Sequence, residues 1–317
     1  MNDPIDSFLA RQPMMVLDGA LATELERRGA DLNDPLWSAK TLIERPDLIH
    51  DVHLDYFRAG ADVATTATYQ TTFEAFARRG VDRKGAAQLM RDAVALAVAA
   101  RDEFWAVEGN RAGRLRPLVA ASVGPYGAML ADGSEYRGRY GLDDAALADF
   151  HRARLHVLAD AGADLLACET LPCLREALLL ARMLREIPAA CAWISFSCND
   201  GEHNCEGEEI AECAAQLHTH EQIVAVGVNC TPPQYMTSLL RQMRSKTAKP
   251  LVAYPNSGER YDASSKQWLG SSGAMRFGEQ ARLWYAQGAR LIGGCCRTGP
   301  EDIRSVKQCV HPEFLPH

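Results

Sequence analysis

Short apolar runs recur along the chain, and helical sequence follows each of them. The runs are continuous rather than alternating, which is typical of strands that are buried on both faces. The predicted strands span residues 14–18, 62–69, 117–122, 163–168, 189–197, 223–230, 250–255 and 289–294. The predicted helices span residues 20–29, 46–59, 82–106, 143–161, 172 onward, 207–218, 232–244, 273–287 and 299–309.

Eight strands that alternate with helices favour a parallel sheet, and eight such units are typical of a (β/α)8 barrel, also called a TIM barrel. A doubly wound open sheet is the main alternative fold. It is disfavoured because no Gly-x-Gly-x-x-Gly motif follows an early strand. No linker or low-complexity stretch divides the sequence. We therefore predict a single α/β barrel domain over residues 1–317.

The composition narrows the classes of partner. Lys and Arg number 34 against 41 Asp and Glu, a net charge of -7, which argues against nucleic acid or an anionic membrane as the main partner. No apolar run approaches the roughly 18 residues of a membrane span, and no secretory leader is recognisable. Ten cysteines in such a chain favour free thiols or metal ligands over disulfides. We expect a cytoplasmic protein.

The end of the eighth strand carries the most specific chemistry in the sequence. Gly293 and Gly294 remove side chains where another group must approach the backbone. Cys295 and Cys296 follow, and Thr298 can cap the next helix. The cysteine pair therefore lies at the carboxyl end of a strand, where α/β barrels build their sites. Two buried core cysteines are the alternative interpretation.

Polar groups also follow the other predicted strands, and they include further thiols. Thiolates favour zinc, and a catalytic zinc needs three protein ligands and an open fourth position. Cys230, Cys168 and Cys198 are the candidates for the third ligand. Cys198 follows a strand of the wrong parity, and Cys168 lies across the barrel from the cysteine pair. We predict Cys230, which is only two strands away.

Zinc that is held by three thiolates activates water poorly, but it can bind a further thiol and hold it as a thiolate. An electron-rich thiolate attacks carbon, so the predicted reaction class is alkylation of a thiol substrate. Carboxylates such as Asp18 and Glu169 would pair with an ammonium group on that substrate. A thiol with an amino group points to a small amino acid such as homocysteine.

These residues lie in motifs that resemble the zinc-dependent homocysteine S-methyltransferases over nearly the whole chain. The motifs are Asp18-Gly-Ala, Thr68-Tyr69, Cys168-Glu-Thr, Val228-Asn-Cys230, Tyr254-Pro-Asn-Ser and Gly293-Gly-Cys-Cys-Arg. The resemblance implies a (β/α)8 barrel and Zn2+ as the cofactor. It also implies that Cys230, Cys295 and Cys296 are the zinc ligands and catalytic residues.

The resemblance further implies which residues bind homocysteine. The candidates are Asp18, Gly19, Tyr69 and Glu169, to which we add Asn256 at the end of the seventh strand. Asp18 and Glu169 each have an alternative interpretation as carboxylates that stabilise the start of the following helix. With homocysteine bound as a thiolate, the predicted reaction is attack on the methyl group of a sulfonium donor, which forms methionine.

The stretch 122–137 looks like the branch of the family that uses S-methylmethionine. The loop 124–141 is long for its position and fits a lid over the site. S-adenosylmethionine and betaine are the alternative donors. Betaine calls for an aromatic cage, which could be built from Tyr126, Tyr136, Tyr140 and Trp268.

A second functional hypothesis from another class is a non-catalytic zinc or thiol redox protein. The adjacent cysteines could oxidise, but the polar groups at the other strand ends would then have no role. The segment 198–209 matches no motif of the family, and we predict that its His203 and Cys205 are surface residues. The sequence leaves the oligomeric state open.

Overall fold

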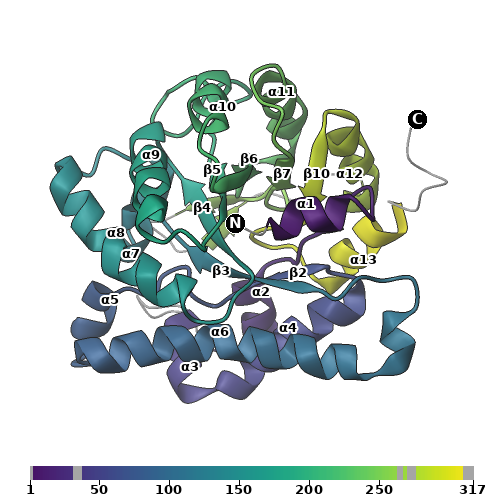
Figure 1. Cartoon of the computed structure of the whole chain (residues 1–317), viewed down its shortest axis with the longest axis horizontal. Helices are drawn as coiled ribbons and strands as arrows, with labels where there is room; N and C mark the ends of the chain where they lie inside the picture. The colour runs from purple at the N-terminus through teal and green to yellow at the C-terminus, as the bar shows by residue number, and fades with distance from the viewer. Residues whose placement is uncertain (1–2, 31–37, 263–266, 270–275, 310–317) are drawn as a thin grey trace.

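The computed structural model describes residues 3–30, 38–262, 267–269 and 276–309. Eight parallel strands form one sheet in the order β1-β10-β7-β6-β5-β4-β3-β2, and helices surround it (Figure 1). The two end strands meet through a bridge between Leu17 and Val63, which closes the sheet into a barrel. The (β/α)8 barrel predicted from the alternating strands and helices is thus confirmed.

All eight barrel strands coincide with predicted apolar runs. Their bounds are β1 (Met15–Val16), β2 (Val63–Thr65), β3 (Leu118–Val123), β4 (Leu165–Leu171), β5 (Ala192–Phe196), β6 (Ile223–Asn229), β7 (Leu251–Tyr254) and β10 (Ala289–Ile292). Two further strands, β8 (Arg260–Asp262) and β9 (Gln267–Leu269), pair antiparallel after β7. The sequence analysis predicted neither strand, because neither is long or apolar enough to stand out.

The longer helices agree with the predicted ones to within a few residues at each end. Their bounds are α2 (Leu21–Arg27), α4 (Pro46–Ala59), α6 (Arg83–Ala106), α8 (Asp144–Ala159), α9 (Leu174–Met183), α10 (Ile210–His218), α11 (Pro233–Arg244), α12 (Phe277–Ala286) and α13 (Pro300–Cys309). The predicted start of α12, residues 273–275, lies outside the described residues. Within the described ranges, no helix has the length and apolar composition needed to cross a membrane.

Several short helices were not predicted, because a few residues carry too little periodicity. They are α1 (Pro4–Leu9), α3 (Ser38–Glu44), α5 (Phe73–Ala77), α7 (Tyr126–Leu130), η1 (Glu108–Arg111), η2 (Ser134–Tyr136) and η3 (Leu184–Glu186). Two of them, α7 and η2, lie in the loop 124–141, which we call the lid loop.

Helix α1 closes the amino end of the barrel (Figure 1). Asp3 begins the helix by accepting hydrogen bonds from the N–H groups of Ile5 and Asp6 at 2.9 and 3.1 Å. Ile5 and Phe8 are buried among residues of the barrel interior that include Trp193. Apolar packing therefore fills this end, and the polar site lies at the opposite, carboxyl end.

Candidate active site

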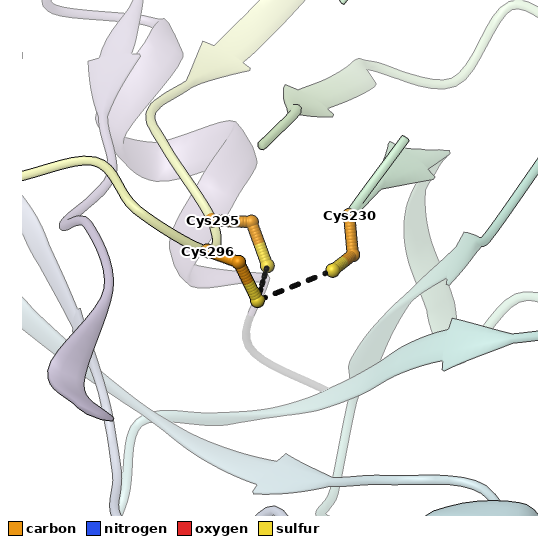
Figure 2. A group of neighbouring side chains, drawn as sticks. All are labelled: Cys230, Cys295 and Cys296. Carbon is orange, nitrogen blue, oxygen red and sulfur yellow. Dashed lines mark hydrogen bonds between the residues drawn. The ribbon is translucent and has the colours of Figure 1, made fainter. Parts of the chain in front are cut away.

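Three cysteine thiols meet at the carboxyl end of the barrel (Figure 2). Cys230 follows β6, and Cys295 and Cys296 follow β10. The Sγ atom of Cys296 lies 3.4 Å from that of Cys230 and 4.0 Å from that of Cys295, and all three Sγ atoms lie within 4.8 Å of one another. Two sulfurs at 2.3 Å from one tetrahedral zinc lie about 3.8 Å apart. The spacing therefore fits a single metal ion.

The glycine pair before the cysteines lets β10 approach the end of β1. A Cβ atom at Gly293 would lie only 2.7 Å from the carbonyl oxygen of Asp18. The N–H of Gly294 donates to that same oxygen at 3.0 Å, and the N–H of Cys295 donates to the Pro255 carbonyl at 2.7 Å. These contacts end the regular strand, so both thiols can turn toward one point.

Thr298 plays a different part from the predicted one. Its hydroxyl donates to the carbonyl of Cys295 at 2.6 Å, which closes the turn after the thiols. Asp302, in the first turn of α13, accepts instead from the N–H of Gly299 at 2.9 Å. The prediction that Thr298 caps the helix was therefore wrong, because the side chain bonds backward along the chain.

Cys230 is held in a backbone conformation that residues with side chains rarely adopt. Its φ is 47°, and Thr170 at φ 59° and Arg297 at φ 69° share this left-handed region. Such strained residues cluster at functional sites. Hydrogen bonds from the other two thiols hold the pKa of Cys230 well below its usual range. The three thiols therefore interact directly with one another through hydrogen bonds.

The two cysteines considered as alternative ligands face away from the cluster. Cys168 lies in the apolar layer between sheet and helices, where burial raises its pKa to about 12. Cys198 is buried in the same layer, and its N–H donates to the hydroxyl of Thr231 at 2.9 Å. Neighbouring side chains on a strand point to opposite faces, so Cys168 points outward where Glu169 points inward.

Asp18 is buried at the end of β1 and bonds to the neighbouring strand. Its carboxylate accepts from the N–H of Thr65 at 2.7 Å and from the Thr65 hydroxyl at 2.9 Å. The helix that follows, α2, has Ala20 as its N-cap residue and no side-chain cap, so the helix-cap interpretation of Asp18 is wrong. Burial raises the pKa of Asp18 to about 8.

Glu169 lies inside β4, on the face that points into the barrel mouth. Its carboxylate accepts hydrogen bonds from the hydroxyls of Ser122 and Tyr254. The next helix starts only at Leu174, so Glu169 does not stabilise a helix start. Burial raises the pKa of Glu169 to about 7. The charge of Glu169 also raises the pKa of Asp18, which places the two carboxyl groups near each other.

The remaining predicted substrate residues line the same end of the barrel. Tyr69 hydrogen-bonds the side chain of Thr170, and burial raises its pKa well above the usual value. A Cβ atom at Gly19 would lie 2.9 Å from the hydroxyl of Tyr56, so this glycine serves close packing. The side-chain oxygen of Asn256 accepts from a backbone N–H two residues later and closes a turn. Their contacts with homocysteine stay predictions.

Comparison with known proteins shows the family to which this chain belongs. Residues 15–310 match the family described as homocysteine S-methyltransferase. Homocysteine S-methyltransferase YbgG of Bacillus subtilis is 55% identical over 96% of this chain and 96% of its own. The chain belongs to the homocysteine S-methyltransferase family. The family and enzyme class predicted from the motifs are confirmed.

Two structures and a plant relative extend this family match. The homocysteine methyltransferase MmuM of Escherichia coli, in a metallated form, has 47% identity and a TM-score of 0.87 over 96% of this chain and 99% of its own. Its oxidized form gives the same TM-score with 48% identity over 97% and 99%. Selenocysteine Se-methyltransferase of Brassica oleracea is 46% identical over 92% of this chain and 87% of its own.

The lid loop is attached near both of its ends to one buried carboxylate, that of Glu176. Glu176 accepts from the N–H of Tyr126 at 2.7 Å and from the hydroxyl of Tyr140 at 3.2 Å. His151 bonds to the same carboxylate at 2.7 Å. Loop residues that are far apart are thereby tied to α9. The sequence offered no signal for this role of Glu176, since the residue lies within an ordinary amphipathic helix.

The aromatic residues considered for a betaine cage have separate partners. Tyr136 brings its hydroxyl to 3.1 Å from the Sγ atom of Cys230. Tyr126 and Tyr140 instead pack on each other, with ring centroids 5.2 Å apart. The side chain of Trp268 lies outside the described residues. Tyr136 is therefore the member of this set whose hydroxyl reaches the thiols.

The segment 198–209 supports the lid loop rather than lying free on the surface. Glu206 accepts from the N–H of Arg139 at 2.8 Å, which connects the segment to the lid loop. His203 is partly exposed and lies beside Asp200, in agreement with its prediction as a surface residue. Cys205 is also partly exposed, although burial raises its pKa to about 12.

Proposed function

We propose that this chain transfers the methyl group of S-methylmethionine to the thiol of homocysteine, and that it forms methionine in a zinc-dependent reaction. One observation carries the proposal: three convergent thiols lie beside two buried carboxyl groups at the mouth of the barrel. The thiols suit a metal that binds sulfur, and the carboxyl groups suit the amino end of an amino acid. Homocysteine carries both of these groups.

Zinc fits the donor set of Cys230, Cys295 and Cys296, because three soft sulfur ligands leave one tetrahedral position open. When bound, zinc would lower the pKa of the homocysteine thiol and keep it as a nucleophilic thiolate. A metallated form of the E. coli relative supports a metal at this fold's site. The free state of all ten cysteines supports the reducing cytoplasm as its compartment.

Asp18 and Glu169 would hold the ammonium group of homocysteine. Their pKa values rise to about 8 and about 7 because burial disfavours a charge without a partner. A substrate ammonium supplies the missing positive charge and so favours both ionised carboxylates. Charge-assisted hydrogen bonds of this kind contribute about 1.5–3 kcal/mol each. Tyr69, Gly19 and Asn256 would shape the pocket around the same substrate.

The reaction is a methyl transfer between two sulfur atoms. A bond forms between the homocysteine sulfur and the methyl carbon while the bond from that carbon to the donor sulfur breaks. The electron pair of the broken bond stays on the donor sulfur, which leaves as the thioether methionine, and the thiol proton of homocysteine goes to solvent. Opposite charges cancel in the transition state, so a site that excludes water favours it. The lid loop provides such a cover.

Metal analysis combined with a panel of methyl donors tests the proposal. We expect about one zinc per chain and methionine formation from S-methylmethionine at a higher kcat/KM than from S-adenosylmethionine or betaine. Methyl transfer from none of the three donors would overturn the enzymatic function. Faster transfer from betaine would overturn the donor, and a full metal content without sulfur ligation in X-ray absorption spectra would overturn the metal site.

A further inference from the structure

Glu135 in the lid loop has a buried carboxylate oxygen. Among the described residues, its Oε2 atom has no hydrogen-bond partner. Arg137 is the nearby cation that acts on it, but that side chain is 60% exposed and pairs with Asp132 at 3.6 Å. Burying an anion without a partner is costly. Such a group is retained where a ligand supplies the missing partner.

The backbone around Glu135 is fixed over the thiols on both sides. The hydroxyl of Ser197, after β5, donates to the carbonyl of Glu135 at 3.1 Å. The next residue, Tyr136, reaches Cys230 at 3.1 Å. A Cβ atom at Gly127 would lie 2.4 Å from the backbone nitrogen of Glu135, so α7 packs directly against it. These contacts fix the backbone of Glu135 at the barrel mouth, and its Oε2 atom is buried there.

The charges at the barrel mouth indicate what the partner of Glu135 must be. The residue next to Glu135, Tyr136, brings its hydroxyl to 3.1 Å from the Sγ atom of Cys230, and burial raises the pKa of Glu135 to about 7. Glu135 therefore belongs to the part of the lid loop that reaches the thiols, where the substrate sulfur would react. In a productive complex the methyl carbon lies about 3–3.5 Å from that sulfur. The cation nearest to Glu135 is therefore the sulfonium, with the donor's ammonium further along the molecule.

We infer that Glu135 binds the positively charged sulfonium of the methyl donor and makes the enzyme select a cationic donor over its neutral thioether. This inference rests on the proposed function and deepens it. Asp18 and Glu169 would serve the ammonium of homocysteine, while Glu135 serves the second substrate from the opposite, lid-loop side. The product methionine lacks the sulfonium charge, so the same contact helps to release it after transfer.

Glu135 acts on binding more than on the chemical step. The sulfonium charge disappears as the methyl group transfers, so a carboxylate beside it stabilises the bound donor at least as much as the transition state. Loss of the Glu135 charge should therefore lower the affinity for the donor. The rate of methyl transfer within the bound complex should stay equal or rise. A KM effect without a kcat loss separates this role from general damage to the site.

Glu135→Gln tests the inference in the metal-loaded full chain. Calorimetric titration in the absence of homocysteine should show S-methylmethionine binding about ten- to a hundredfold more weakly than to the wild type. Its KM should rise by the same factor with kcat unchanged or higher. The inhibition constant of methionine, measured as a competitor of S-methylmethionine, should change by less than about twofold. Homocysteine affinity should stay the same.

Two further variants control for effects on the lid loop. Asp132→Asn removes a charge from the exposed side of the same loop and should leave donor affinity unchanged. Glu135→Asp keeps the charge and should retain more of the preference for S-methylmethionine over methionine than Glu135→Gln does. Melting curves of all variants should coincide with that of the wild type.

If Glu135→Gln weakened the binding of S-methylmethionine and of methionine equally, the inference would be overturned. The lost contact would then belong to the amino acid part that both molecules share. Unchanged donor binding, or weakened homocysteine binding, would overturn it as well. A wild type that fails to bind S-methylmethionine would overturn the proposed function and this inference together. A wild type that binds it while Glu135→Gln binds equally well would overturn this inference alone.

Discussion

The two ends of this barrel are built from the same strands but have opposite chemistry. At the amino end, Ile5 and Phe8 of α1 fill the opening and bury apolar surface. At the carboxyl end, Asp18, Glu169 and Cys230 are equally buried, yet their pKa values are strongly shifted. Packing at the amino end therefore stabilises the folded state. The carboxyl end instead contains buried polar groups and strained backbone, which are unfavourable for stability.

The difference shows that the amino end of the barrel contributes to stability, whereas the carboxyl end carries the reactive groups. Thr170, Cys230 and Arg297 adopt the left-handed region, and all three lie just after the carboxyl ends of strands or within their last residues. Strain of this kind persists only where the surrounding structure supports it. Apolar packing at the other end supplies that support. Substitutions at the two ends should therefore separate stability from function.

The largest effect is expected from paired cysteine substitutions at the two ends. Cys230→Ser should lower metal affinity by more than about a hundredfold and abolish methyl transfer, because one of three ligands is lost. Cys191→Ser, in the apolar interior near α1, should retain metal and activity and change only the melting temperature. Metal analysis and calorimetry check both. Full metal retention in Cys230→Ser would contradict the ligand set and would bring Cys168 back as a candidate.

A smaller effect, confined to stability, is expected from Phe8→Ala. Removing a buried aromatic side chain leaves a cavity and should cost about 3–5 kcal/mol in the free energy of unfolding. Metal content and homocysteine affinity should stay unchanged under conditions where the variant is folded. Urea unfolding and homocysteine titration check this. A loss of homocysteine affinity in the folded variant would show that the two ends are energetically coupled.

Glu169→Gln should have the opposite effect to Phe8→Ala: it should weaken substrate binding and leave stability nearly unchanged. The variant keeps the shape but loses the charge that would pair with the ammonium of homocysteine. Affinity for homocysteine should fall by about 1.5–3 kcal/mol, roughly ten- to a hundredfold. Metal content and affinity for simple thiols that lack an amino group should be unchanged. Calorimetric titration beside a melting curve decides the matter, and equal homocysteine affinities in both proteins would remove Glu169 from the substrate site.

The smallest effect, taken per group and per pH unit, concerns the pH dependence of stability without substrate. Folding raises the pKa of Asp18 from 3.8 to about 8 and that of Glu169 from 4.5 to about 7. The folded state then holds more protons than the unfolded state between these values, so stability falls as pH rises from about 4 to about 8. Each group contributes a slope of at most about 1.4 kcal/mol per pH unit.

Denaturant unfolding across this pH range measures the slope. The double variant Asp18→Asn, Glu169→Gln should flatten it, and saturating homocysteine should also reduce it in the wild type, because the ammonium favours the ionised carboxylates. Phe8→Ala should keep the wild-type slope, since that change lies at the other end. An unchanged slope in the double variant would mean that other groups set the pH dependence.

Local sequence carries much of this fold. Continuous apolar runs predict all eight barrel strands, because a strand buried on both faces must be apolar throughout. The chemistry of Cys295 and Cys296 can also be read locally, since a glycine pair before them breaks the strand. Short elements such as α1 cannot be predicted from the local sequence in this way. Six residues show no periodicity, and only their fit into the barrel interior makes Ile5 and Phe8 important.

The sequence by itself determined the barrel, the family and the thiol pair, because these depend on residue order and on patterns within one strand or turn. The tertiary structure decided which distant groups meet. It turned Cys168 outward and Glu169 inward, bonded Asp18 to Thr65 instead of to a helix, and placed Tyr136 of the lid loop beside Cys230. Burial, and with it each pKa, arises only when separate strands close around a group, so no single stretch of sequence contains it.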